Sequence, residues 1–169
     1  TFNQNGGINT VTGAANGLTL GFNSGSNGTY NQNAGTNSIP HLYLGFNGDS
    51  SGTYNLNDGS LSANIERIGY GGTGIFNQNG GTNTLSGDLR IGDASYTGSS
   101  GTYNLNAGTL SVGGNIAPLN SPSSGGRSIG TLAIGNGTLI VGGGNGIINV
   151  GNLVLGSIPG SNVNFALSD

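Results

Sequence analysis

The chain repeats one short motif along almost its whole length. In its clearest copies an aromatic residue is followed by Asn, a variable residue and a second Asn, and a Gly-containing turn comes next. The aromatics at the first position are Phe2, Tyr30, Tyr54, Phe76 and Tyr103, and Leu132 takes this position in a sixth, degenerate copy. Spacings of 22–29 residues between them are typical of stacked architectures in which each unit contacts its neighbours. The repeat therefore predicts a fold built from similar coils.

Composition favours strands over helices. Gly (37 residues) and Asn (26 residues) fill more than a third of the 169 positions. Gly disfavours helix interiors, and Asn side chains compete with helical hydrogen bonds. Short apolar alternations such as Leu-Thr-Leu and Leu-Tyr-Leu recur at regular intervals, which is typical of strands and unlike a disordered low-complexity chain.

Each unit contains three short extended segments: the aromatic motif, a segment after the Gly turn, and a Leu/Ile-x-Leu/Ile segment that usually precedes Gly. Residues 64–68 and 115–119 read as a longer third segment, which predicts a β-bulge there. We expect an all-β, parallel three-stranded β-solenoid with about six coils of roughly 24 residues. The crossover preference favours right-handed winding. Residues 1–169 would form one domain, with a Gly-rich surface loop at 120–131 and the start of a further coil at 162–169.

The variable residue of the motif correlates with the residue five places later. When the variable residue is Gln, the residue five places later is Asn, as in Gln32 and Asn37. When the variable residue is Leu or Ile, the later residue is Leu, as in Leu56 and Leu61. Buried amides need hydrogen-bonding partners, so contact across the Gly turn would explain the rule, although duplication of two ancestral unit types would also give it. We expect the aromatic and variable positions to face inward. The two Asn columns would then face outward and form amide ladders.

Charge and residue usage exclude several classes of protein. The net charge is −3 with nine formal charges, so no basic patch for nucleic acid is present in the sequence. No apolar run reaches the length of a membrane-spanning helix, and we expect no membrane insertion. The chain contains no Cys, which removes thiolate chemistry, and we expect neither a metal nor another cofactor.

One face concentrates the charged residues. Aligning the third segments places six side chains on neighbouring rungs of this face: His41, Tyr43, Glu66, Arg67, Asp88 and Arg90. Arg67 and Arg90 would share a column, where they repel unless Glu66 and Asp88 neutralise them or an anion binds. A salt-bridge ladder and a glycan-binding site both fit this pattern. Catalysis would need better paired carboxylates, so we expect no enzyme.

The two ends of the repeat array would expose strand edges. The first strand contains Phe2, Asn3, Gln4 and Asn5, and the last segment contains Asn162, Val163 and Phe165. Uncovered edges recruit further strands. We therefore expect these residues to contact either flanking coils of the same chain or other copies of the protein.

The unit Gly-Thr-Tyr-Asn-Leu-Asn-Ala-Gly-Thr-Leu-Ser-Val, at 101–112, resembles the β-strand repeats of bacterial autotransporter passengers and related large surface proteins. The degenerate unit at 130–141 is similar to them too, and the resemblance extends over nearly the whole chain. It implies a secreted or surface-exposed β-helical stalk or adhesin.

We therefore expect an extracellular structural protein that stacks end to end into a surface fibre or forms part of a longer stalk. The alternatives are a glycan-binding adhesin that uses the charged face, an ice-binding protein and a polysaccharide-degrading enzyme. Ice binding would need a regular Thr array, and Ile75 interrupts the one formed by the Thr residues at 29, 53, 102 and 131.

Overall fold

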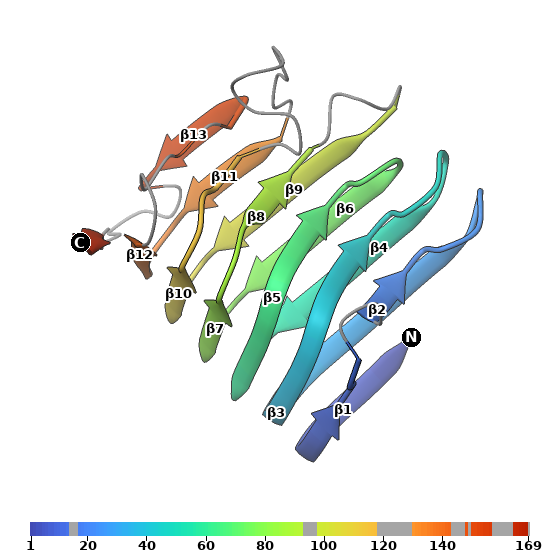
Figure 1. The fold of residues 1–169 in the computed structure, drawn as a ribbon, viewed down its shortest axis with the longest axis horizontal. Helices are drawn as coiled ribbons and strands as arrows, with labels where there is room; N and C mark the ends of the chain where they lie inside the picture. Colours follow the sequence, from blue (N-terminus) through green and yellow to red (C-terminus); the bar gives the residue numbers. More distant parts are fainter. Residues whose placement is uncertain are drawn as a thin grey trace.

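The structure, a computed structural model, describes residues 1–13, 17–92, 98–117, 130–142, 148, 150–156 and 164–168. These residues form an all-β fold, a parallel β-solenoid of about five turns, so the predicted fold class is confirmed at this level. In Figure 1 the strands stack in chain order, and the first and last strands lie at opposite ends of the stack. Within the described ranges no helix is long and apolar enough to cross a membrane.

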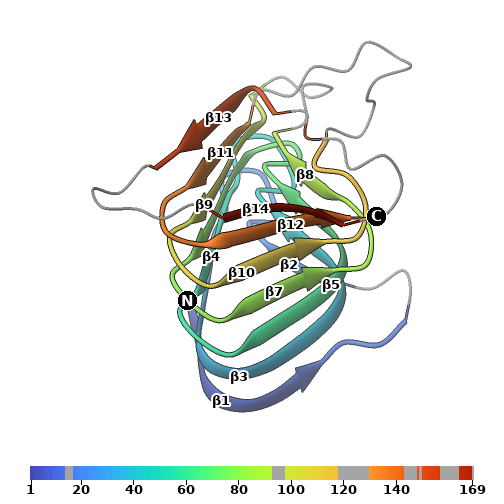
Figure 2. The same ribbon diagram turned by 90° about the vertical axis from the view of Figure 1, so that its left-hand side faces the viewer.

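All strand pairings between the described residues are parallel and fall into three series. In Figure 2 the first series forms the left side of the solenoid and the second series faces the viewer. The first series contains β1 (Phe2–Thr10), β3 (Asn27–Leu44), β4 (Ser51–Leu56), β6 (Thr73–Gln78), β9 (Ser100–Leu105), β11 (Thr131–Ile134) and β13 (Asn152–Leu155). The second contains β1, β3, β5 (Ser60–Ile68), β7 (Thr82–Leu85), β10 (Thr109–Val112), β12 (Thr138–Gly142) and β14 (Asn164–Ser168). The third contains β2 (Gly17–Leu20), β3, β5 and β8 (Leu89–Ile91), extended by bridges from Leu89 to Ile116 and on to Ile148.

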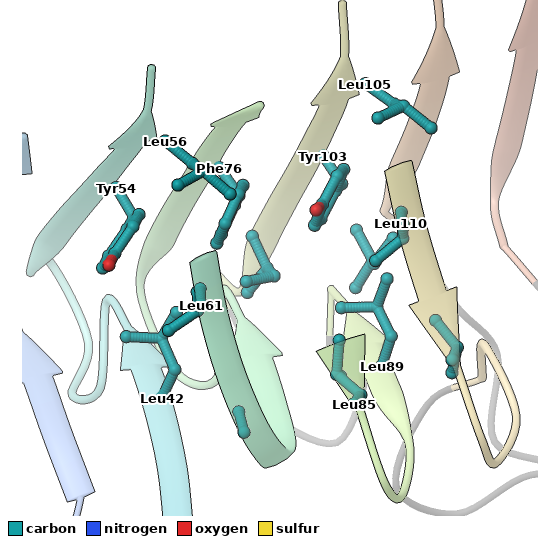
Figure 3. Close-up of a cluster of buried hydrophobic side chains, with 14 of the residues drawn as sticks. Leu42, Tyr54, Leu56, Leu61, Phe76, Leu85, Leu89, Tyr103, Leu105 and Leu110 are labelled. Carbon is teal, nitrogen blue, oxygen red and sulfur yellow. The ribbon is translucent and has the colours of Figure 1, made fainter. Parts of the chain in front are cut away.

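Alternation along these strands sends every second side chain into the interior. The aromatic residues of the motif form a continuous inward stack, with ring centroids 5.0 Å apart between Tyr30 and Tyr54, 5.1 Å between Tyr54 and Phe76, and 4.5 Å between Phe76 and Tyr103. Figure 3 shows the rings of Tyr54, Phe76 and Tyr103 in a row, with the leucines of neighbouring strands packed beside them. The predicted inward placement of the aromatic and variable positions is confirmed.

Glycine makes the tight corners between the series. Gly69 ends the third segment of its unit with a φ of +74°, in the left-handed region that favours glycine. A Cβ atom added there would lie 2.1 Å from the carbonyl oxygen of Ser100 in the next turn. Only glycine therefore allows the backbone of successive turns to approach this closely at the corner.

Two amide ladders run along the outside of the first series. The first ladder contains Asn3, Asn31, Asn55, Asn77 and Asn104, and the second contains Asn5, Asn33, Asn57, Asn79 and Asn106. In each ladder the Nδ2 of one Asn donates to the Oδ1 of the Asn in the preceding unit, over 2.7–2.9 Å. The predicted ladders are confirmed, and they bind each turn to the one before it.

Tyrosine hydroxyls explain the correlation between the variable residue and the residue five places later. The hydroxyl of Tyr54 donates to Oε1 of Gln32 over 2.6 Å and accepts from Nδ2 of Asn37 over 2.9 Å. Gln78, Asn83 and Tyr103 repeat this arrangement at 2.7 and 3.0 Å. The two amides of one unit are thus joined through the tyrosine of the next unit, rather than by the direct contact that we expected.

The same rule accounts for the residues without a hydroxyl. The unit that contains Leu56 and Leu61 is followed by Phe76, and the unit that contains Leu105 and Leu110 is followed by Leu132. An unpaired buried hydroxyl or amide costs about 1–3 kcal/mol. A unit with a Gln–Asn pair is therefore followed by a tyrosine, and a unit with a Leu–Leu pair is followed by a residue without a hydroxyl.

The predicted β-bulge at residues 64–68 is wrong. Strands β3 and β5 keep one constant register from the pair Thr36–Ser60 to the pair Leu44–Ile68. Register shifts occur between β1 and β3, after Gln4 and after Asn5. A further shift of one residue occurs between β5 and the next coil, from the pair Ala63–Leu85 to the pair Glu66–Leu89, and the extra residue lies in 86–88 and not in β5. Residues 118–129, which include most of the predicted surface loop and the end of the second predicted bulge, lie outside the described residues.

Candidate ligand-binding site on the outer face

The outward positions of the third series bring an aromatic residue and two cations into one column. Tyr43 pairs in register with Arg67, and Arg67 pairs with Arg90 on the next rung. Each is flanked by inward residues of its own strand, so alternation places all three side chains on the outer face. The predicted Arg67–Arg90 column is therefore confirmed.

Glu66 does not lie on this face, and the expectation that it does is wrong. Its side chain has no exposed surface and occupies an inward column between Leu42 and Leu89. Asn83 donates from Nδ2 to both carboxyl oxygens over 3.1 Å. Burial raises the pKa of Glu66 to about 8, although the Asn83 hydrogen bond acts in the opposite direction. At neutral pH this carboxyl is mainly protonated and does not neutralise Arg67.

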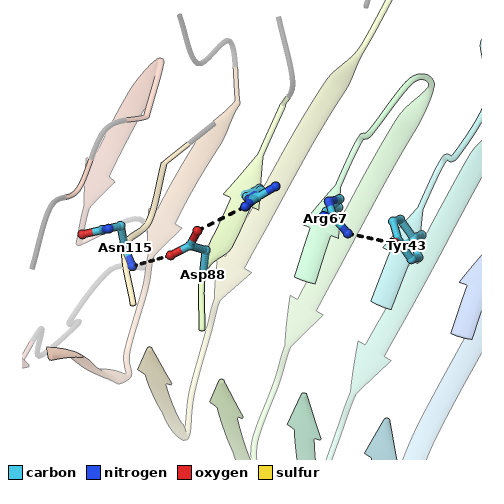
Figure 4. A network of polar contacts seen from close by, with 5 residues as sticks. Tyr43, Arg67, Asp88 and Asn115 are labelled. Carbon is cyan, nitrogen blue, oxygen red and sulfur yellow. Dashed lines mark hydrogen bonds and ion pairs between the residues drawn. The ribbon is translucent and has the colours of Figure 1, made fainter. Parts of the chain in front are cut away.

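Within the part of the chain that the structure describes, Arg67 interacts with aromatic rings rather than with a carboxylate. Its Nη1 donates to the hydroxyl of Tyr43 over 2.7 Å, as Figure 4 shows. Its guanidinium carbon lies 4.9 Å from the ring centroid of Tyr43 and 5.7 Å from that of Tyr70. Such cation–π contacts hold the guanidinium in place while leaving its positive charge in full.

Arg90 has a weak ionic partner. Its Nη2 lies 3.3 Å from Oδ2 of Asp88, whose Oδ1 accepts a hydrogen bond from the backbone N–H of Asn115 over 3.0 Å (Figure 4). The expected salt-bridge ladder is thus present at one of the two arginines. Nε of Arg67, and Nε and Nη1 of Arg90, are buried without a hydrogen-bond partner.

Aromatic residues extend the site beyond the residues expected from the sequence. Phe22, Phe46 and Tyr70 each follow the Gly that ends a third segment, and together with Tyr43 they form what we call the outer aromatic cluster. Ring centroids are 5.2 Å apart between Phe22 and Phe46, and 5.1 Å apart between Phe46 and Tyr70. Tyr43 meets Phe46 edge-on at 5.2 Å. His41 lies beside the cluster, with its ring centroid 6.1 Å from that of Tyr43.

Phe22 is the exposed end of the outer aromatic cluster, with 54% of its surface accessible. The sequence signal for this cluster is an aromatic residue directly after the Gly that ends a third segment, which recurs in consecutive units. A flat aromatic surface beside a cation can bind a ligand that has one apolar face and one charged group.

A shallow groove of about 360 Å³ lies elsewhere, where the second series turns into the third. Its walls include Ser38, Pro40, Ser62 and Thr84, and all the residues that line it are neutral. Among the described residues, no group of three or more His, Asp or Glu side chains is placed to hold a metal ion. The outer face of the third series therefore remains the stronger candidate.

The residues expected at the open edges are placed as follows. Phe2, Asn3, Gln4 and Asn5 lie on β1, where Phe2 is 57% exposed and Gln4 is buried. Phe165 belongs to β14 and pairs with Leu139, whereas Asn162 and Val163 lie outside the described residues.

The exposed apolar surface gathers at the two outermost strands of the first series. Within the described ranges five large hydrophobic side chains are exposed, and four of them belong to β1 or β13: Phe2, Ile8, Leu153 and Leu155. The apolar interior is therefore uncovered at both edges of this series.

Comparison of the chain with models of known protein families, with curated proteins and with solved structures gave no match. The candidate site therefore stands on its geometry: two arginines on adjacent rungs, beside an aromatic cluster that is exposed at Phe22.

Proposed function

We propose that this protein is an extracellular structural protein, a β-solenoid that stacks end to end into a surface fibre or forms part of a longer surface stalk. The observation that carries the proposal is the exposure of apolar side chains at both edges of the first series. Phe2 and Leu153 terminate the same inward column, with exposed fractions of 57% and 43%. A strand added at either edge would continue this column and pair the open backbone groups.

The finer architecture that we propose has three strands per coil, about six coils of roughly 24 residues, and one domain over residues 1–169. The three series of parallel pairings support the count of strands per coil. Right-handed winding follows from the general preference of parallel crossovers.

The proposed location is the cell surface, and the proposed relationship is to autotransporter-like passengers. The Gly- and Asn-rich repeat supports both, as do two amide ladders that need neither metal nor disulfide. We assign no catalytic role, since glycoside chemistry uses two carboxyl groups. Of the two carboxylates expected on the third segments of the outer face, the structure places Asp88 there and Glu66 in the interior.

Electron microscopy of the purified chain over a concentration series tests the proposal. We expect filaments that lengthen with concentration and have an axial repeat of about 4.8 Å. The variant Phe2→Asp, which places a charge on the open edge, should abolish them, whereas Phe46→Asp, a matched change one coil in from the edge, should not. Short rods at every concentration would refute end-to-end stacking of this chain.

A second candidate function is saccharide binding on the outer face. The exposed ring of Phe22, stacked on Phe46, favours it, because the apolar face of a sugar packs on such a surface.

A further inference from the structure

We propose that the outer aromatic cluster and the Arg67–Arg90 column form one binding site for an acidic saccharide. The sugar rings would lie on Phe22 and Phe46, and a carboxylate would face the two guanidinium groups. This inference rests on saccharide binding, the second candidate function, and is independent of fibre formation.

The charge of the site calls for an anion. Arg67 and Arg90 occupy adjacent rungs, about 4.8 Å apart along the stack, where like charges repel. Arg90 has a partner in Asp88, whereas the contacts that Arg67 makes with other described residues are aromatic and neutral. The carboxyl of Glu66, directly beside Arg67 in the chain, points into the interior. Among the described residues of the face, the two arginines outnumber the one carboxylate, Asp88, in a protein whose net charge is −3.

The chemistry of the guanidinium groups selects the kind of anion. Arginine offers planar N–H groups that match a carboxylate better than a single ammonium does. Three of the guanidinium nitrogens, on Arg67 and Arg90, are enclosed without a hydrogen-bond acceptor. A carboxylate at the rim of the pair stabilises the delocalised charge even where it does not reach these enclosed atoms.

The aromatic part of the site sets the size of the ligand. Phe22, Phe46 and Tyr70 follow one another at the corner of successive turns, and Arg67 lies against Tyr70. From Phe22 to the rung of Arg67 is two rungs, or about 10 Å at the spacing of paired strands. A saccharide of two or more units, lying along the stack, would touch both the exposed ring and the cations.

Isothermal titration calorimetry with three oligosaccharides of equal length tests the inference: one of uronic acids, one of neutral hexoses and one of sulfated hexoses. We expect the uronic acid oligomer to bind at least about tenfold more tightly than the neutral one, the effect of one charge-assisted hydrogen bond. Its affinity should fall as salt rises, because exposed charges are screened.

Variants separate the two parts of the site. The double variant Arg67→Gln and Arg90→Gln should remove the preference for the acid while keeping weak binding of the neutral sugar. Phe22→Ser should weaken both, and Phe2→Ser, an exposed aromatic on β1, should change neither. Circular dichroism checks that each variant keeps the β fold. If the double variant loses the fold, the single variant Arg67→Gln takes its place in the comparison.

The outcomes are distinct. Equal binding of the acidic and neutral oligomers would overturn the inference and leave saccharide binding in place. Tighter binding of the sulfated oligomer would overturn the assignment of a carboxylate. Binding of none of the three would overturn both the inference and the second candidate function, without bearing on filament formation.

Discussion

Replacing Glu66 by Gln should stabilise the protein at neutral pH. Glu66 is fully buried in a column otherwise occupied by leucine and isoleucine, and its side-chain partner is the amide of Asn83. Gln has nearly the same shape and keeps an oxygen for this amide to donate to, but it carries no ionisable proton. The substitution therefore isolates the free energy of keeping the carboxyl protonated.

The size of the effect follows from the pKa. Burial raises the pKa of Glu66 from 4.5 to about 8, so between these values the native state binds more protons than the unfolded state. The free energy of unfolding then falls as pH rises, by about 1.4 kcal/mol per pH unit. The total loss across the window is about 5 kcal/mol, of which about 3 kcal/mol has occurred by pH 7. Below pH 4.5 Glu66 causes no loss of stability, because its carboxyl is protonated in both the native and the unfolded state.

Denaturant unfolding at a series of pH values from 4 to 9 measures this. The wild-type protein should lose stability up to about pH 8, the folded pKa of Glu66. Glu66→Gln should remove this loss, unfold at nearly the wild-type denaturant concentration at pH 4, and gain about 3 kcal/mol at pH 7. Asp58→Asn is the matched control, because Asp58 is exposed and its amide replacement can still accept from the backbone N–H of Gly59. A wild-type profile that is flat from pH 5 to 8, or a Glu66→Gln profile that keeps the slope, would refute the reasoning.

Further predictions concern the contacts between turns. Tyr54→Phe removes the hydroxyl shared by Gln32 and Asn37 and should cost about 1–3 kcal/mol in denaturant unfolding. Adding Gln32→Leu and Asn37→Leu should restore stability, and failure of this rescue would contradict the tyrosine rule. Gly69→Ala should cost at least about 2 kcal/mol from its positive φ and its clash with Ser100, whereas Gly48→Ala, where a Cβ meets nothing within 4 Å, should be nearly neutral by the same measurement. Asn77→Ala breaks two ladder bonds and should lower the thermal midpoint, whereas an unchanged midpoint would show that the ladder adds nothing to stability.

The core and the ladders could be predicted from the sequence because both depend on one repeated period. Residues such as Tyr54 and Phe76 recur at equivalent positions with alternating neighbours, so their inward direction follows from strand geometry. The Asn columns follow from the same alignment. These predictions needed no knowledge of long-range contacts beyond the stacking of one unit on the next.

Glu66 could not be placed correctly because its chemistry argued against its position. A carboxyl is rarely buried without a cation, so grouping it with Arg67 on the surface was the natural expectation. The register shows that Glu66 corresponds to Leu42 and Leu89. Interpreting residues 64–68 as a lengthened segment obscured this correspondence.

The outer aromatic cluster was missed for a different reason. Phe22, Phe46 and Tyr70 follow the corner glycines, in segments that lie outside the strands of each unit. These residues recur at an even spacing of 24 residues, but strand alternation does not predict the direction of side chains that lie outside the strands. The signal, an aromatic residue directly after the Gly that ends a third segment, is present in the sequence.

The tyrosine hydroxyls have a consequence for how such a chain can grow or shrink by recombination. Excision of residues 51–72 would bring Phe76 onto Gln32 and Asn37, which would then lose the hydroxyl that joins them. Excision of 51–99 would instead bring Tyr103 to the same place and keep the junction intact. Unequal crossing-over in this stretch should therefore survive selection when it removes two neighbouring repeats and fail when it removes one.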